Sequence, residues 1–214
     1  MSSDRIRVVI RVVIRQIAHR NQRTKPLRAP DASIASGLSV ERSTRCSAPV
    51  RLWPGTFVVM ANDERFISHS VIIDAAAEEL YDMLADLTRM GEWSRACTGA
   101  TWDEGWGPSA IEGAWFTGHN LLGDDPYDAH CQIVEAVRPT TIAWMQGGTD
   151  KGVAEWRYRL TPVEDGTEVT ESWTLVRPLP PDIVDDDLAA AMRVGFDKGI
   201  RDTLDRLKHN IEGA

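Results

Sequence analysis

Glu171 has the most informative position of any residue that could do chemistry in this chain. In the run 166–177 (GTEVTESWTLVR), Val169, Trp173 and Leu175 alternate with polar residues, which predicts a strand with one apolar face. Glu171 falls on that apolar face, where a carboxylate is costly unless it is paired, protonated or in contact with a ligand. We therefore interpret it as a polar anchor for a ligand or a general acid/base. The alternative is a structural carboxylate that a neighbour satisfies or a bulge turns outward.

Asn120 and Cys131 are the next candidates. Asn120 shares strand parity with Phe116, so an inward Phe116 places an amide inward that could orient a ligand oxygen or cap the following loop. His119 then points outward. Cys131 is predicted to be a buried thiol on the face opposite its neighbour His130, which excludes a Cys–His dyad between them, and no third group is placed to orient His130 as a base.

Aromatic and sulfur-containing side chains supply the rest of a predicted ligand-binding surface. The tryptophans are numerous enough to predict some aromatic lining for a flat ligand, although any one of them could simply fill the core. An exposed Trp115 would indicate a homodimer surface. The predicted ligand-binding residues are Trp93, Trp102, Phe116, Asn120, Cys131, Trp144, Trp156, Glu171, Trp173, Met192 and Phe196.

The elements that must position these residues follow from periodicity and turn signals. A strand at 66–73 precedes a helix with Asp74 as N-cap, which continues to about Gly91. Turn signals then separate six short strands, whose short connections imply antiparallel pairing. A long apolar stripe from Leu188 to Ile211 predicts one C-terminal helix. In it, Gly195 and Gly199 admit close backbone approach, leave room for a ligand or have no role. The six strands are expected at 97–103, 113–121, 127–137, 140–146, 153–162 and 167–177.

Charge divides the chain into two parts. Residues 1–59 carry 11 basic and 3 acidic side chains, whereas residues 60–214 carry 13 and 29. We expect 1–59 to be a disordered leader, or sequence upstream of a true start at Met60, and 60–214 to be one domain. The strong negative charge of this domain disfavours nucleic acid as a partner.

Other function classes are disfavoured by absent signals. No apolar run is long enough for stable membrane insertion, and the arginines of residues 5–15 disfavour a secretory signal. The three cysteines lack metal spacing, which predicts free thiols and a cytoplasmic protein. No phosphate-binding loop, zinc motif or serine-hydrolase motif is present, so we expect neither a metal nor a cofactor.

Strand, helix, six strands and a long helix predict an α+β fold, a curved antiparallel sheet of about seven strands around the C-terminal helix. A cavity between the two would bind a small molecule. The segments 72–94, 113–120, 131–144, 155–173 and 199–212 resemble the polyketide cyclase/dehydrase-type branch of the START-like helix-grip (SRPBCC) superfamily. The resemblance covers about 66–212 and implies the helix-grip fold. It leaves function open, because the superfamily includes cyclases, lipid carriers and receptors.

Three functions fit these observations. The first is binding of a hydrophobic molecule, aromatic, polyketide-like or lipid-like, in the cavity. The second is a cyclase or dehydratase in which Glu171 is the catalytic acid/base. The third is an interaction or co-chaperone module without a ligand, which requires a filled core and an exposed apolar patch. A measured cavity separates the first two from the third.

Overall fold

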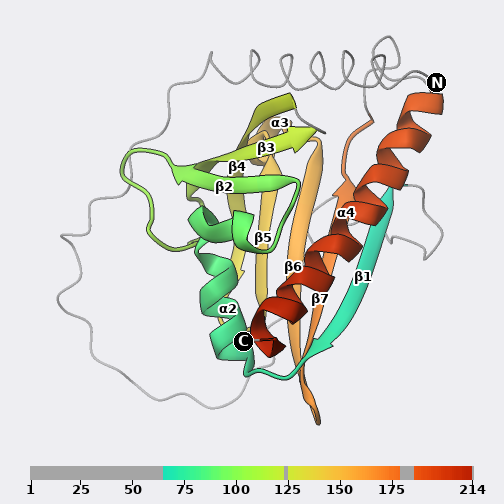
Figure 1. The fold of residues 1–214 in the computed structure, drawn as a ribbon. Coiled ribbons are helices and arrows are strands. Elements are labelled where there is room, and N and C mark those ends of the chain that lie inside the picture. Colours follow the sequence, from blue (N-terminus) through green and yellow to red (C-terminus); the bar gives the residue numbers. More distant parts are fainter. Residues whose placement is uncertain (1–64, 123–124, 179–185, 214) are drawn as a thin grey trace, which may run out of the picture.

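The computed structural model describes residues 65–122, 125–178 and 186–213 and contains one seven-stranded antiparallel sheet with a long C-terminal helix (Figure 1). The strand order is β1-β7-β6-β5-β4-β3-β2. The predicted helix-grip α+β fold is confirmed. The predicted leader 1–59 lies outside the described residues. The strands are β1 (Phe66–Ile73), β2 (Cys97–Trp102), β3 (Trp115–Leu122), β4 (Asp125–Val137), β5 (Thr141–Gln146), β6 (Ala154–Val163) and β7 (Gly166–Leu175).

The helices differ from prediction at the start of the domain. Helix α2 (Ala77–Ala85) begins after Ala76 and has no side-chain N-cap. The prediction of Asp74 as N-cap is wrong, because α2 begins two residues later with Ala76 in the N-cap position. The backbone N–H of Asp74 donates to the Glu212 carboxylate at 3.0 Å. The predicted single helix is also divided. Asp86 ends α2 and caps the 3₁₀ helix η1 (Leu87–Glu92).

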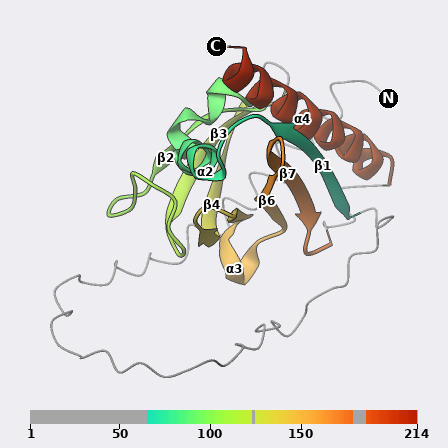
Figure 2. The same cartoon turned by 90° about the horizontal axis from the view of Figure 1, so that it is seen from below.

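Two further helices complete the fold. The short helix α3 (Gly148–Lys151) occupies a position where the sequence predicts only a turn. The long helix α4 (Asp186–Glu212) packs against β1 and β7, while α2 contacts β5 and β6 and η1 contacts β2. Figures 1 and 2 show α2 and α4 on the same, concave side of the curved sheet. The concave face is therefore covered by two helical segments that are far apart in the sequence.

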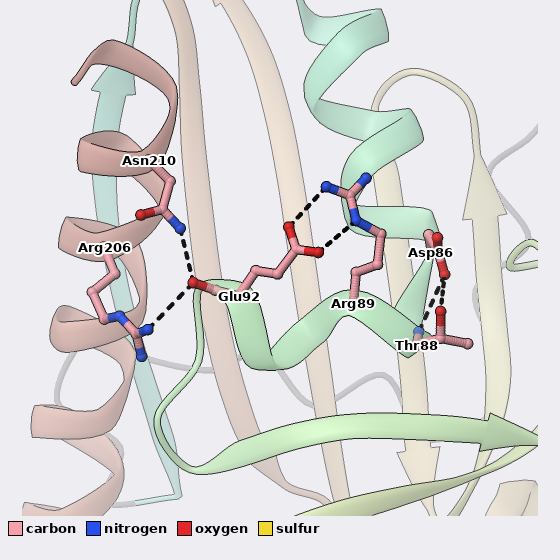
Figure 3. Close-up of polar contacts among 6 residues, drawn as sticks. All are labelled: Asp86, Thr88, Arg89, Glu92, Arg206 and Asn210. Atoms are coloured by element: carbon pink, nitrogen blue, oxygen red, sulfur yellow. Dashed lines mark hydrogen bonds and ion pairs between the residues drawn. The ribbon is translucent and has the colours of Figure 1, made fainter. Parts of the chain in front are cut away.

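Polar contacts join the 3₁₀ helix η1 to α4 (Figure 3). The backbone carbonyl of Glu92, at the end of η1, accepts from Asn210 at 2.8 Å and from Arg206 at 3.3 Å, both on α4. The Glu92 carboxylate accepts two hydrogen bonds from Arg89, at 2.8 and 2.7 Å. Because the last carbonyls of a helix have no partner within the helix, α4 satisfies a group that η1 leaves free.

Helix α4 also covers the edge of the sheet that β1 forms. Arg193 donates to the carbonyl of Phe66 at 3.2 Å, and Lys208 donates to that of Ile72 at 2.6 Å. These carbonyls lie near the two ends of the edge strand β1, and unpaired edge groups are where strands of other chains add. The same contacts hold α4 along β1.

Gly91 is expected to be a position where even one methyl group destabilises the fold. A Cβ there would lie 2.4 Å from the backbone oxygen of Thr98 in β2, so η1 would have to move away from the sheet. We expect Gly91→Ala to lower the free energy of unfolding by about 1–3 kcal/mol in urea titrations, the usual cost of overpacking. The control is Gly199→Ala, whose Cβ meets no atom within 4 Å. Equal effects of the two substitutions would contradict this explanation.

Candidate functional site

A cavity of about 180 Å³ lies between the concave face of the sheet and α4. An apolar protein cavity of about 150 Å³ is large enough to bind benzene, so the volume suffices for a small ligand. Nine of the eleven predicted ligand-binding residues line it: Phe116, Asn120, Cys131, Trp144, Trp156, Glu171, Trp173, Met192 and Phe196.

Aromatic rings form the contact between helix and sheet beside this cavity. Phe196 of α4 lies 4.9 Å from Trp173 and 5.7 Å from Trp156, measured between ring centroids. The two tryptophans are direct cross-strand neighbours on β7 and β6. Across the sheet, Trp144 lies 6.2 Å from Phe116 in an edge-on arrangement. Such pairs contribute energy beyond the area they bury. The lining therefore contains two groups of packed aromatic rings, one against α4 and one on the sheet.

Trp93 and Trp102 are the two predicted residues that do not line the cavity. Trp93 directly follows η1 and is completely buried in the core. Because it lies outside any strand, strand parity could not place it. Trp102 is the last residue of the edge strand β2, and its ring packs on Phe116 and against Gly107. The loop after β2 covers it.

Glu171 lies inward, as the alternation predicts, with only 5% of its surface exposed. Its cross-strand neighbours are Tyr158 on β6 and His69 on β1. His69 directs its Nε2 to Asp197 of α4 at 2.8 Å. Tyr158 lowers the pKa of Glu171 as a hydrogen-bond donor would, whereas Oε2 has no hydrogen-bond partner among the described residues. Burial raises the pKa of Glu171 from 4.5 to about 8, so the side chain is mostly neutral at pH 7.

Tyr158 is the residue beside Glu171 whose role the sequence did not reveal. The alternation of β6 places it on the inner face, but a buried tyrosine is ordinarily a core residue. Burial raises its pKa well above 10, and the nearby Glu171 raises it further. The Trp93 indole lowers the pKa of Tyr158, as a hydrogen-bond donor would. Its Nε1 nevertheless makes no hydrogen bond of good geometry within the described structure. Tyr158 therefore remains protonated beside Glu171, its direct cross-strand neighbour.

The other polar groups of the lining are neutral. Asn120 donates to the Gly118 carbonyl at 2.9 Å, within its own strand. Burial raises the pKa of Tyr127 to about 12, and it also raises the pKa values of Cys97 and Cys131. Both cysteines are free and buried, so they remain thiols rather than reactive thiolates. Sequence analysis did not nominate Tyr127 or Cys97, because nothing in the periodicity separates them from ordinary core residues.

Gly195 and Gly199 both line the cavity from α4. A Cβ built at either position meets no atom within 4 Å, and neither glycine has a positive φ. Close backbone packing therefore does not require glycine at these positions. Of the interpretations left open by the sequence, this excludes close backbone approach. The open space fits both glycines that leave room for a ligand and glycines that have no role.

His130 lies on the outer face of the sheet, away from the cavity. Its Nε2 lies 2.8 Å from Asp103, and its ring stacks on Trp115 at 4.6 Å. The sequence-based view of His130 without an orienting group is wrong, because the loop after β2 supplies Asp103. Trp115 is half-buried rather than fully exposed. His119 lies outward as predicted, with 42% of its side chain exposed and Asp128 as its partner.

Two further searches of the described ranges give negative results. Within them, no three His, Cys, Asp or Glu side chains are grouped as metal ligands would be. None of the described helices combines the length and apolar character needed to cross a membrane.

Comparisons with known proteins agree with this architecture. The model of the family described as polyketide cyclase / dehydrase and lipid transport matches residues 66–212. No curated protein sequence matches the chain. The Polyketide_cyc-like protein Cgl2372 from Corynebacterium glutamicum is 29% identical, with 69% of this chain and 91% of that chain covered and a TM-score of 0.49.

Two solved structures with TM-scores above 0.5 share the fold at low identity. Protein NE0264 from Nitrosomonas europaea is 12% identical, with 71% of this chain and 97% of that chain covered and a TM-score of 0.53. The di-domain ARO/CYC protein StfQ from the steffimycin biosynthetic pathway is 14% identical, with 70% of this chain and 51% of that chain covered and a TM-score of 0.54. With the family match over residues 66–212, the chain belongs to the polyketide cyclase / dehydrase and lipid transport family.

Proposed function

We propose that this protein binds a hydrophobic small molecule in the cavity between its sheet and α4, with Glu171 as the polar anchor. The observation that carries the proposal is the Oε2 of the buried Glu171, which has no partner among the described residues and lies beside an aromatic cavity whose other described lining residues are uncharged. A buried polar atom without a partner costs about 1–3 kcal/mol. A ligand oxygen within reach of Oε2 would remove that cost.

The aromatic contacts support the same function. Phe196 and the tryptophans Trp156 and Trp173 give the cavity flat apolar walls, and such surfaces with a few placed polar groups are typical of small-molecule sites. An interaction module without a ligand would need a filled core. The cavity of about 180 Å³ therefore favours ligand binding over that alternative.

Native mass spectrometry of the freshly purified full chain tests this proposal. We expect a species heavier than the chain by the mass of a small molecule, which is lost on denaturation and recovered in an organic extract. As a second readout, added 2-acetonaphthone, an uncharged aromatic ketone, should bind the extracted protein with one-to-one stoichiometry. A ligand-free mass together with no binding of this ketone would contradict the proposal.

A cyclase or dehydratase activity is the second candidate, favoured by the pKa of about 8 at Glu171. A group with a pKa near the working pH can both accept and donate a proton. In a dehydration, the Glu171 carboxylate would take the proton next to a carbonyl group. The resulting acid would then protonate the departing hydroxyl, which leaves as water while the carbon–carbon double bond forms.

The Glu171→Gln variant separates this enzyme function from binding alone. The amide keeps the shape and a hydrogen-bond donor, but it cannot accept and return the proton. We expect turnover of a β-hydroxy ketone to fall by at least about a hundredfold, in line with the usual contribution of acid–base catalysis, while binding of 2-acetonaphthone changes little. Normal turnover by this variant would show that Glu171 is not the catalytic acid/base.

A further inference from the structure

The charge of the cavity lining restricts the class of ligand. Among the described residues that line the cavity, none is Lys, Arg or His, and Glu171 is the one acidic residue. A ligand anion would therefore be buried without a compensating charge, which is strongly unfavourable. A ligand ammonium group would require Glu171 to ionise in the same apolar surroundings, with desolvation of both charges. An uncharged ligand with an acceptor oxygen meets neither penalty.

The two glycines of α4 bear on the size of the ligand that the cavity can hold. Gly195 and Gly199 are four residues apart and so lie on one face of the helix, with Phe196 and Met192 also in the lining. Gly195 is exposed and Gly199 is half-buried, so the space beside them runs from the surface toward the cavity. Glycine disfavours a helix, and a Cβ at either position would meet open space. The absence of two side chains keeps this space free.

We propose that the cavity takes an uncharged ligand whose carbonyl or hydroxyl oxygen accepts a hydrogen bond from Glu171, and that Gly195 and Gly199 set how large the remainder of that ligand can be. This inference rests on the proposed binding function and adds the ligand class and the residues that determine its size. The Oε2 of Glu171, which lacks a partner within the described part of the chain, is an observation independent of the glycines and concerns the same cavity.

Three naphthalene probes of similar size test the ligand class at pH 7. They are 2-acetonaphthone, which is uncharged, 2-naphthoate, which has a carboxylate in place of the acetyl group, and 2-naphthylmethylammonium. We expect the full chain to bind the ketone at least tenfold more tightly than either charged probe. Equal or tighter binding of a charged probe would overturn the uncharged class while leaving a binding function in place. Failure of all three to bind would count against the binding function itself.

The Gly199→Leu variant tests the size restriction. Its side chain should extend into the open space and weaken binding of 2-acetonaphthone at least tenfold. The matched control is Ala190→Leu, which adds the same side chain at an exposed position of α4 and should change the affinity less than twofold. Wild-type affinity in Gly199→Leu would overturn the role of the glycines without affecting the ligand class.

The smaller Gly199→Ala variant tests the size restriction in the case that Gly199→Leu does not fold. Because its Cβ meets no atom within 4 Å, we expect an unchanged or raised melting temperature together with a two- to fivefold weaker affinity for 2-acetonaphthone. A folded Gly199→Ala with undiminished affinity, found alongside a Gly199→Leu that does not fold, would also overturn the size restriction.

Discussion

Between pH 4.5 and pH 8, the free energy of unfolding of the wild-type protein should fall by about 5 kcal/mol relative to that of its Glu171→Gln variant. In the folded state the pKa of Glu171 is raised from 4.5 to about 8 by burial. Between these values the folded chain holds a proton that the unfolded chain releases, so stability falls as pH rises. Each unit of pKa shift corresponds to about 1.4 kcal/mol, which gives the expected total. Above pH 8 the contribution is lost and the difference stays constant.

Urea titrations at intervals from pH 4 to pH 9 measure this difference. The wild-type and Glu171→Gln curves should nearly coincide near pH 4 and separate steadily to about pH 8. Every other titrating group is common to both proteins, so the difference isolates Glu171. Parallel curves over the whole range would mean that Glu171 ionises as easily in the folded chain as in the unfolded one. The proposal that a protonated Glu171 anchors the ligand would then be wrong.

The sequence was sufficient to find Glu171 because its signal is local. In an antiparallel strand the side chains alternate between the two faces, so one carboxylate among Val169, Trp173 and Leu175 is inward by parity alone. The same rule placed Phe116 and Asn120 in the lining correctly. Strand parity requires only that the strand be identified, and six consecutive turn signals made that identification reliable here.

Contacts that depend on loops and on helix ends could not be predicted from strand parity. Trp93 follows a 3₁₀ helix, where no period fixes the direction of its side chain, and its burial follows from how η1 packs. Asp74 has the residue type of an N-cap, but α2 begins only after Ala76, and the Asp74 N–H donates to Glu212 of α4. The partner of His130 likewise comes from the loop after β2. Each of these outcomes is decided by tertiary packing rather than by local sequence.

The pairing of Tyr158 with Glu171 is an intermediate case. Both residues are inward by parity, but only the β6–β7 register makes them direct neighbours. A shift of two residues would keep every side chain on its face and separate the two groups. The hairpin turn therefore fixes a feature of the site that the pattern of apolar residues alone does not specify. The pairing with Tyr158 lowers the pKa of Glu171, so its raised value comes from burial and not from this register.

The surface charge of the domain is consistent with a neutral ligand. Residues 60–214 carry a net charge of −16, since 29 acidic residues outnumber 13 basic ones. A negative surface repels anions before they reach the cavity, and the lining offers them no cation. Long-range and local electrostatics therefore act in the same direction. This agreement strengthens the case against a fatty-acid carboxylate or a phosphate as the group bound beside Glu171.

Trp173→Ala should be among the most destabilising single substitutions of the cavity wall. Trp173 is 6% exposed, and its ring lies 4.9 Å from Phe196 of α4. Truncating a buried tryptophan to alanine usually costs about 3–5 kcal/mol, because apolar contacts are lost and a cavity remains. Here the lost contacts include one that holds α4 to the sheet. We therefore expect a loss of about 3–5 kcal/mol in urea titrations, and weaker binding of 2-acetonaphthone.

Two control variants show whether this loss comes from the helix contact. Trp173→Phe keeps a ring for Phe196 to pack against and should cost less than half as much as the alanine variant. Trp115→Ala removes a half-buried tryptophan from the outer face of the sheet, where the ring stacks on His130 rather than on α4, and should leave binding of the ketone unchanged. If Trp115→Ala weakened binding as much as Trp173→Ala does, the effect would be one of general stability. A selective loss in Trp173→Ala would instead mean that the aromatic contact beneath α4 shapes the binding cavity.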